Sequence, residues 1–156
     1  MTPNQADSPG VRVPPPLVFL AGLAIGLVLS NWAPTEYLGR AIARPLGRVV
    51  TGIGVLLALS AVYAFSRART DLRPNRPSSA LVRTGPYRFT RNPMYVSLTI
   101  VYVGVAVMMQ SLWSLLLLPL VVAFIRMKVI GREEAYMERR FGADYLRYKS
   151  EVRRWF

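Results

Sequence analysis

Residues 94–125 read MYVSLTIVYVGVAVMMQSLWSLLLLPLVVAFI and form a long apolar run. As one straight helix this run would measure roughly 48 Å, whereas the hydrocarbon core of a bilayer is roughly 30 Å thick. Its polar residues gather near the middle, at Gln110 and Ser111. We therefore predict two short spans, about 94–109 and 111–125, that turn near Gln110 and cross the membrane as a helical hairpin.

Two more apolar runs precede this hairpin, at about 17–33 and 46–65. The first is long for the apolar part of a signal peptide and no A-x-A-like cleavage site closes it, so we interpret it as a retained span. Its Gly22 and Gly26 form a small-xxx-small pair, which lets a neighbouring helix approach closely. The pattern predicts an all-α, polytopic membrane protein of about four transmembrane helices.

The two ends of the chain differ from this apolar body. Residues 1–16 are polar and proline-rich, which is typical of a disordered tail. Beyond the hairpin the chain is amphipathic, and we predict two cytoplasmic helices there, about 129–141 and 144–154. Residues 17–156 are therefore predicted to form a single domain.

The overall composition narrows the possible chemistry. The chain is 53% hydrophobic, carries a formal net charge of +12, and contains no cysteine and no histidine. Disulfides, Cys/His metal sites and histidine as a general base are thereby excluded. A strongly basic chain first suggests nucleic acid as a partner. Here the basic residues flank apolar spans, which favours a lipid bilayer as partner and no nucleic acid.

The basic residues are unevenly distributed between the loops. Sixteen of the twenty Lys and Arg lie in the 66–93 segment and in the C-terminal tail from Arg126 onward. Four spans place these two segments and the N-terminus on one side of the membrane, which is cytoplasmic by the positive-inside rule. The 33–48 loop mildly contradicts this orientation, because it carries Arg40, Arg44 and Arg48.

The segment 84–95, TGPYRFTRNPMY, is the first candidate for a functional site. Gly-Pro and Asn-Pro are turn signals, and Pro93 suits the first turn of the span that follows Asn92. The N-terminal end of that helix would present free N–H groups and a positive dipole end, which suit a carboxylate or a phosphate. The alternative is a plain entry into a span, with arginines that reach the membrane surface.

The adjacent acids Glu133 and Glu134 are the second candidate. At 100° per residue both carboxylates project along the apolar face of the predicted helix, within roughly 60° of Ile130. A buried carboxylate needs a partner, which is either an arginine of the preceding cluster or a cationic ligand. The alternative is a pair of acids that favour the helix dipole.

A third pattern is an aromatic stripe near the C-terminus, with residues spaced 3, 4 and 3 apart: Tyr145, Tyr148, Val152 and Trp155. An amphipathic helix at the membrane surface explains such a stripe without any function. Tyr145 and Tyr148 can equally form the wall of a ligand pocket.

Taken together, these motifs resemble the isoprenylcysteine carboxyl methyltransferase family, which is related to the phospholipid N-methyltransferases. The likeness covers about residues 81–156 and rests on Gly85-Pro86-Tyr87, Arg91-Asn92-Pro93-Met94-Tyr95, Glu133-Glu134, Phe141-Gly142, Tyr145, Tyr148 and Arg154-Trp155. The family motif reads Arg-His-Pro-x-Tyr-x-Gly, followed after a membrane hairpin by Glu-Glu. Here Asn92 stands for the His and Ser97 for the Gly, which looks like a bacterial variant and implies a bacterial inner membrane.

The resemblance implies S-adenosylmethionine as cofactor and a lipophilic acceptor with a carboxylate, amine or thiol. It also implies a cofactor pocket between the 91–95 turn, the hairpin and the C-terminal helices, open to the cytosol. We assign catalysis to Glu133, Glu134 and Arg91. We assign cofactor binding to Tyr87, Arg91, Asn92, Pro93, Tyr95, Glu133, Glu134, Tyr145 and Tyr148.

These assignments follow the charges of the cofactor. The two glutamates suit its amino group or ribose hydroxyls, Arg91 and the helix N-terminus suit its carboxylate, and the tyrosines can flank the adenine or the sulfonium. One glutamate can also serve as a base for the acceptor.

Two other functions stay open at this point. One is an NADPH-dependent membrane reductase of the sterol-reductase type, although two carboxylates would repel the phosphates of NADPH. The other is a non-catalytic membrane protein. The sequence does not define the oligomeric state.

Overall fold

The computed structural model describes residues 13–34, 37–68 and 80–155, so most of the predicted tail lies outside the described residues. All regular elements within these ranges are helical, which confirms the all-α prediction. They are α1 (Pro15–Trp32), α2 (Arg40–Arg67), the 3₁₀ turn η2 (Gly85–Arg88), α3 (Pro93–Met108), α4 (Leu112–Ile125), the π-helical turn η3 (Arg126–Ile130), α5 (Gly131–Phe141) and α6 (Ala143–Glu151).

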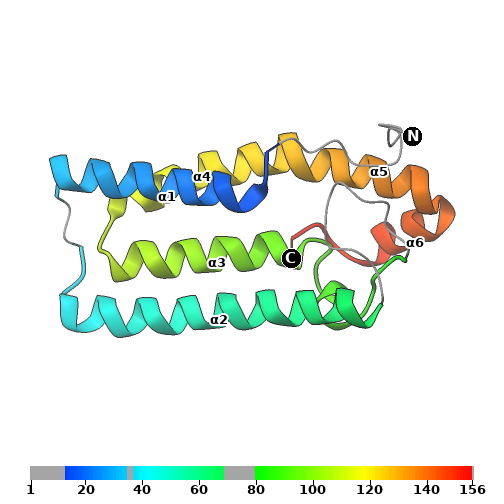
Figure 1. Cartoon of the computed structure of the whole chain (residues 1–156), viewed down its shortest axis with the longest axis horizontal. Helices are drawn as coiled ribbons and strands as arrows, with labels where there is room; N and C mark the ends of the chain where they lie inside the picture. Colours follow the sequence, from blue (N-terminus) through cyan, green and yellow to red (C-terminus); the bar gives the residue numbers. More distant parts are fainter. Residues whose placement is uncertain (1–12, 35–36, 69–79, 156) are drawn as a thin grey trace, which may run out of the picture.

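Three helices are long and apolar enough to cross a membrane: Pro15–Trp32, Arg40–Arg67 and the continuous helix Leu112–Phe141. The shorter α3 is also apolar and lies beside α2, while α1 lies beside α4 (Figure 1). The chain is therefore an integral membrane protein. The predicted hairpin is confirmed, because α3 ends at Met108 and α4 begins at Leu112.

Two predicted starts differ from the observed ones. α1 begins at Pro15, inside the stretch assigned to the tail, since proline at the first helical turn loses no intrahelical hydrogen bond. α2 begins at Arg40 instead of about 46, because hydropathy marks only the part of a helix that lies in hydrocarbon. Arginine is a good helix former, so the helix continues beyond the apolar run.

The C-terminal region departs further from the prediction. The predicted span at about 111–125 and the predicted helix at about 129–141 are not separate elements, because α4, η3 and α5 form one continuous helix. Charged residues end the apolar run there without interrupting the backbone hydrogen bonds. α6 ends at Glu151 instead of 154, and the last residues turn back toward the start of α3 (Figure 1).

The hairpin loop is fixed by hydrogen bonds to the other loop at that end of the bundle. Gln110 has a positive φ of 58°, which is uncommon for a residue with a side chain. Its side-chain amide accepts a hydrogen bond from the backbone N–H of Leu38 at 3.2 Å and donates one to the backbone oxygen of the same residue. These two hydrogen bonds hold the hairpin loop against the segment around Leu38.

Small residues let α1 approach α4, as the Gly22–Gly26 pair predicts. A Cβ atom on Gly26 would lie 2.4 Å from the Cα of Ser114, and one on Gly22 would lie 2.4 Å from the Cγ2 of Val121. The close approach also allows the hydroxyl of Ser111 to donate a hydrogen bond to the backbone oxygen of Gly26 at 3.2 Å.

Gly26→Ala is therefore expected to destabilise the protein by about 1–3 kcal/mol, the usual cost of overpacking. Gly52→Ala is the matched control, because a Cβ there meets nothing within 4 Å. Thermal unfolding of both variants in the same detergent measures the difference. Equal melting temperatures for the two variants would show that the α1–α4 contact is not this close.

Candidate functional site

The C-terminal tail and the turn before α3 are joined by hydrogen bonds to the backbone oxygens of the tail. The N–H of Arg91 donates to the oxygen of Arg153 at 3.0 Å, and the hydroxyl of Thr90 donates to the oxygen of Arg154 at 2.9 Å. Asn92 precedes α3 without capping it; its Nδ2 donates instead to the oxygen of Arg154 at 3.1 Å. The tail therefore closes one side of the turn.

Glu134 lies at the centre of this junction and is only 6% exposed. Arg154 holds it through two parallel hydrogen bonds, with Nε 2.9 Å from Oε1 and Nη2 bonded to Oε2. The Nη1 of Arg91 lies 3.3 Å from the same Oε1. Two arginines thus face one carboxylate, and the bidentate pair with Arg154 is of a strong and directional kind.

Arg91 is itself buried but incompletely bonded. Its side chain is 8% exposed, and within the described residues its Nε and Nη1 have no hydrogen-bond acceptor of good geometry. The contact with Glu134 is therefore mainly electrostatic at Nη1. Buried donors without an acceptor are costly, so these two nitrogens are the least satisfied polar atoms of this arginine.

Glu133 has a different environment from its neighbour. It is half-buried and accepts a hydrogen bond from the phenol of Tyr95 at 2.7 Å. Burial raises the pKa of Glu133 to about 7; the hydrogen bond from Tyr95 acts against this shift and the charge of Glu134 adds to it. α5 is rich in charged residues and extends beyond the apolar part of its helix, which places Glu133 outside the membrane-spanning segments.

Three tyrosines line the same region. Tyr145 and Tyr148 are 4% and 3% exposed and meet edge to face, with ring centroids 6.2 Å apart. The phenol of Tyr148 donates to the backbone oxygen of Tyr87 at 2.7 Å, which joins α6 to η2. Burial raises the pKa of all three phenols, so they stay neutral at physiological pH. Tyr145 and Tyr148 are thus buried against the turn, whereas Val152 and Trp155 of the predicted stripe lie beyond the end of α6.

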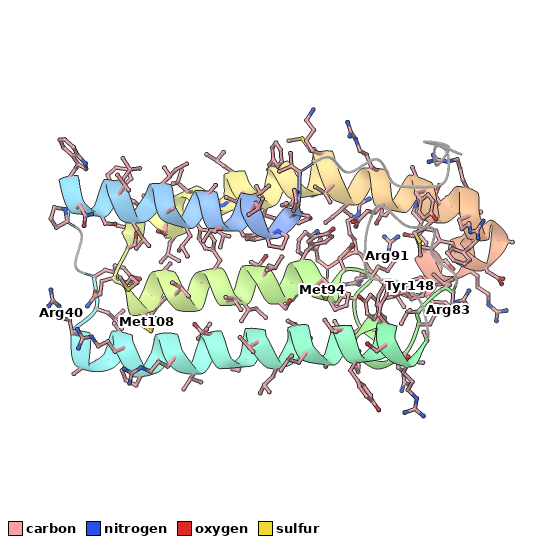
Figure 2. All side chains as sticks on the ribbon, in the orientation of Figure 1. Arg40, Arg83, Arg91, Met94, Met108 and Tyr148 are labelled. Atoms are coloured by element: carbon pink, nitrogen blue, oxygen red, sulfur yellow. The ribbon has the colours of Figure 1, made fainter. Side chains whose placement is uncertain are left out.

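The structure brings most of the predicted site residues to one end of the bundle. Figure 2 shows Arg91, Tyr148 and Arg83 there, while Arg40 lies at the other end. Pro93 is fully buried as the first residue of α3 and offers no polar side-chain atom. The side-chain amide of Asn92 already donates a hydrogen bond to the backbone oxygen of Arg154 in the tail.

Arg154 is the site residue that the sequence assignment missed. It belongs to the quoted Arg-Trp motif, but periodicity gives no sign that the tail reverses and returns to Glu134. The only available signal was the charge itself, since a buried carboxylate requires a cation and arginines are plentiful near the C-terminus.

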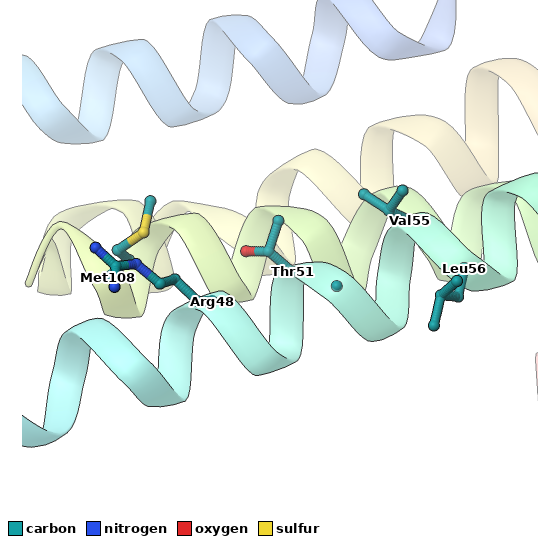
Figure 3. Close-up of a pocket in the computed structure, with 6 residues that line it drawn as sticks. Arg48, Thr51, Val55, Leu56 and Met108 are labelled. Atoms are coloured by element: carbon teal, nitrogen blue, oxygen red, sulfur yellow. The ribbon is translucent and has the colours of Figure 1, made fainter.

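Two cavities of about 500 and 430 Å³ lie at the opposite end of α2 and α3, and no predicted site residue lines either of them. Figure 3 shows the first, between Arg48 and Leu56 on α2 and Met108 on α3. At the turn, both oxygens of Glu134 are instead hydrogen-bonded to the guanidinium of Arg154.

Comparison with known proteins identifies the family. A model described as phospholipid methyltransferase matches residues 42–144, a range that contains the turn and both glutamates. The chain belongs to the phospholipid methyltransferase family. An uncharacterized protein of Haemophilus influenzae (strain ATCC 51907 / DSM 11121 / KW20 / Rd) is 36% identical over 62 residues, which are 40% of this chain and 98% of that protein. No solved structure gives a significant match.

Family membership confirms the resemblance seen in the sequence. As a phospholipid methyltransferase family member with membrane-spanning helices, the chain is a membrane methyltransferase. The match favours this reaction over the reductase alternative. The roles of the single residues stay predictions.

Proposed function

We propose that this chain uses S-adenosylmethionine to methylate a lipophilic acceptor that carries a carboxylate, amine or thiol. The observation that supports the proposal most is a pair of opposite, incompletely satisfied charges beside the start of α3. Arg91 is buried with unbonded N–H groups, and Glu133 is half-buried with a phenol as its hydrogen-bond donor. The methionyl end of the cofactor, with one carboxylate and one ammonium, complements both groups.

In this proposal each side chain has a distinct task. Arg91 would receive the carboxylate on the N–H groups that lack an acceptor, and Glu133 would pair with the ammonium. Glu134 would be a positioning residue, because Arg154 already occupies its oxygens and its charge holds Arg91 in place. The neutral phenols of Tyr87, Tyr145 and Tyr148 would line the cofactor.

When bound, S-adenosylmethionine supplies an electrophilic methyl group on a sulfonium. Methyl transfer is a displacement, so the protein contributes mainly by orienting the two partners and excluding water. The site lies where α3 enters the apolar part of the bundle, with Tyr95 and Ile130 in the hydrophobic core. A lipophilic acceptor can therefore approach from the bilayer while the cofactor approaches from the aqueous side.

We further propose that the site and both termini face the cytoplasm, where the cofactor is available. The excess of Lys and Arg in the 66–93 segment and the tail supports this orientation. A bacterial inner membrane fits the same arrangement.

Binding of S-adenosylhomocysteine to the purified protein in detergent tests the proposal. We expect binding for the wild type and none for NADPH. Arg91→Lys keeps the charge beside Glu134 but removes the Nε donor, so affinity should fall roughly tenfold, as expected for one charge-assisted hydrogen bond.

Arg139→Lys is the matched control, because Arg139 is an exposed residue of α5. The affinity of this variant for S-adenosylhomocysteine should stay at the wild-type value. Titration calorimetry measures all three proteins. No binding to the wild type at millimolar S-adenosylhomocysteine, or binding of NADPH in its place, would overturn the proposal.

A further inference from the structure

Three arginines at the far end of α2 have no part in the proposed methyl transfer. Arg40, Arg44 and Arg48 are spaced by four residues and therefore lie along one face of the helix. Figure 2 shows Arg40 and Met108 at the end of the bundle opposite Arg91. These are also the residues that oppose the positive-inside pattern, so topology alone does not account for them.

Two adjoining cavities lie at these arginines. The smaller, about 430 Å³, has both polar and apolar walls and is lined by residues that include Asn31, Arg40, Arg44, Arg48 and Gln110. The larger, about 500 Å³, is mainly apolar and is lined by Arg48, Thr51, Gly52, Val55, Leu56 and Met108. Arg48 and Met108 line both cavities, so a basic pocket continues into an apolar groove along α2. Figure 3 shows the groove, with Arg48 and Met108 at one end and Leu56 at the other.

Along α2, the basic pocket and the apolar groove follow one another in the same order as the headgroup and the acyl chains of a lipid. Arg48 and Arg67 are separated by 19 residues, roughly 28 Å along a helix, which is close to the thickness of the hydrocarbon core. Arg48 therefore lies at the boundary where lipid phosphates are found. Thr51 to Leu56 follow within the hydrocarbon, at the depth of acyl chains.

The charges and polar atoms suit an anionic headgroup. Arg44 and Arg48 carry the charge that matters here, and the described residues that line the two cavities include no Asp or Glu.

We propose that this pocket and groove bind one anionic phospholipid, with the phosphate on Arg44 and Arg48 and an acyl chain along Thr51 to Leu56. The bound lipid is not the methyl acceptor. Tyr87 of the candidate site contacts Phe65, which lies 17 residues, or roughly 26 Å, farther along α2 than Arg48. The lipid therefore occupies the opposite monolayer and stabilises the α2–α3 pair.

Native mass spectrometry of the full chain in detergent tests this site. Phosphatidylglycerol should bind the wild type roughly tenfold more tightly than phosphatidylcholine of the same chain length, and Arg44→Gln/Arg48→Gln should remove this preference. The control Arg67→Gln/Arg139→Gln removes two exposed charges elsewhere and should change the affinity by less than about twofold. All variants are first compared by circular dichroism and gel filtration.

A second variant tests the groove while all arginines are kept. Gly52→Phe fills the groove, since a Cβ at Gly52 meets nothing within 4 Å, and it should weaken phosphatidylglycerol binding. Glycerol 3-phosphate carries the headgroup phosphate without acyl chains and should not displace the lipid. Three results would overturn the proposal. The wild type could bind the two lipids equally, the control double variant could lose as much affinity for phosphatidylglycerol as Arg44→Gln/Arg48→Gln, or glycerol 3-phosphate could displace the lipid.

Discussion

Glu134→Ala is expected to lower the free energy of unfolding by about 3–5 kcal/mol, the usual cost of breaking a buried ion pair from one side. The carboxylate is shared by Arg91 and Arg154, so its removal leaves two cations near one another without a counter-charge. Arg91 is almost fully buried and is not able to recover its hydration by a small movement. Equilibrium unfolding in mixed micelles measures the loss.

Glu138→Ala is the matched control on the same helix. Glu138 pairs with Lys149, but both side chains are more than a third exposed, so the loss should not exceed about 1 kcal/mol. Glu134→Gln keeps one acceptor oxygen for Arg154 but loses the charge, so its stability should lie between those of the two alanine variants. Similar stabilities for Glu134→Ala and Glu138→Ala would mean that Glu134 does not hold the tail.

Glu133→Gln is expected to reduce the methyl-transfer rate by roughly thirty- to a hundredfold at low cofactor concentration, with little change in stability. The amide still accepts the hydrogen bond from Tyr95, so the fold is kept. The negative charge opposite the ammonium is lost, however, and a buried charge-assisted contact of this kind contributes about 2–3 kcal/mol. Radiolabelled methyl transfer into membrane lipid extract and small thiols measures the rate.

The pH dependence separates this role from a structural one. Burial raises the pKa of Glu133 to about 7, so the carboxylate is mostly protonated at pH 6 and mostly ionised at pH 8. Only the ionised form pairs with an ammonium. Affinity for S-adenosylhomocysteine should therefore rise roughly tenfold from pH 6 to pH 8.

Two variants check that this rise comes from Glu133. In Glu133→Gln the rise should disappear. Tyr95→Phe removes the hydrogen bond that lowers the pKa of Glu133, so the midpoint should move to higher pH. A pH profile that is the same in the wild type and in Glu133→Gln would assign the titration to another group.

The sequence alone determined the parts of this protein that the bilayer controls. Hydrocarbon thickness sets the length of each apolar run, so the spans and the turn at Gln110 were readable from the order of residues. Periodicity also predicted that Glu133 and Glu134 lie on the inner face of their helix. The family was recognisable because the turn and the glutamates keep their order and spacing.

Only the tertiary structure decided how the two glutamates differ. Periodicity gives the face of a helix but not the partner across it, and that partner comes from a tail that reverses after Glu151. The reversal brings Arg154 to Glu134 and leaves Glu133 with the phenol of Tyr95. Contacts of this kind depend on how distant segments pack, which no local pattern of residues encodes.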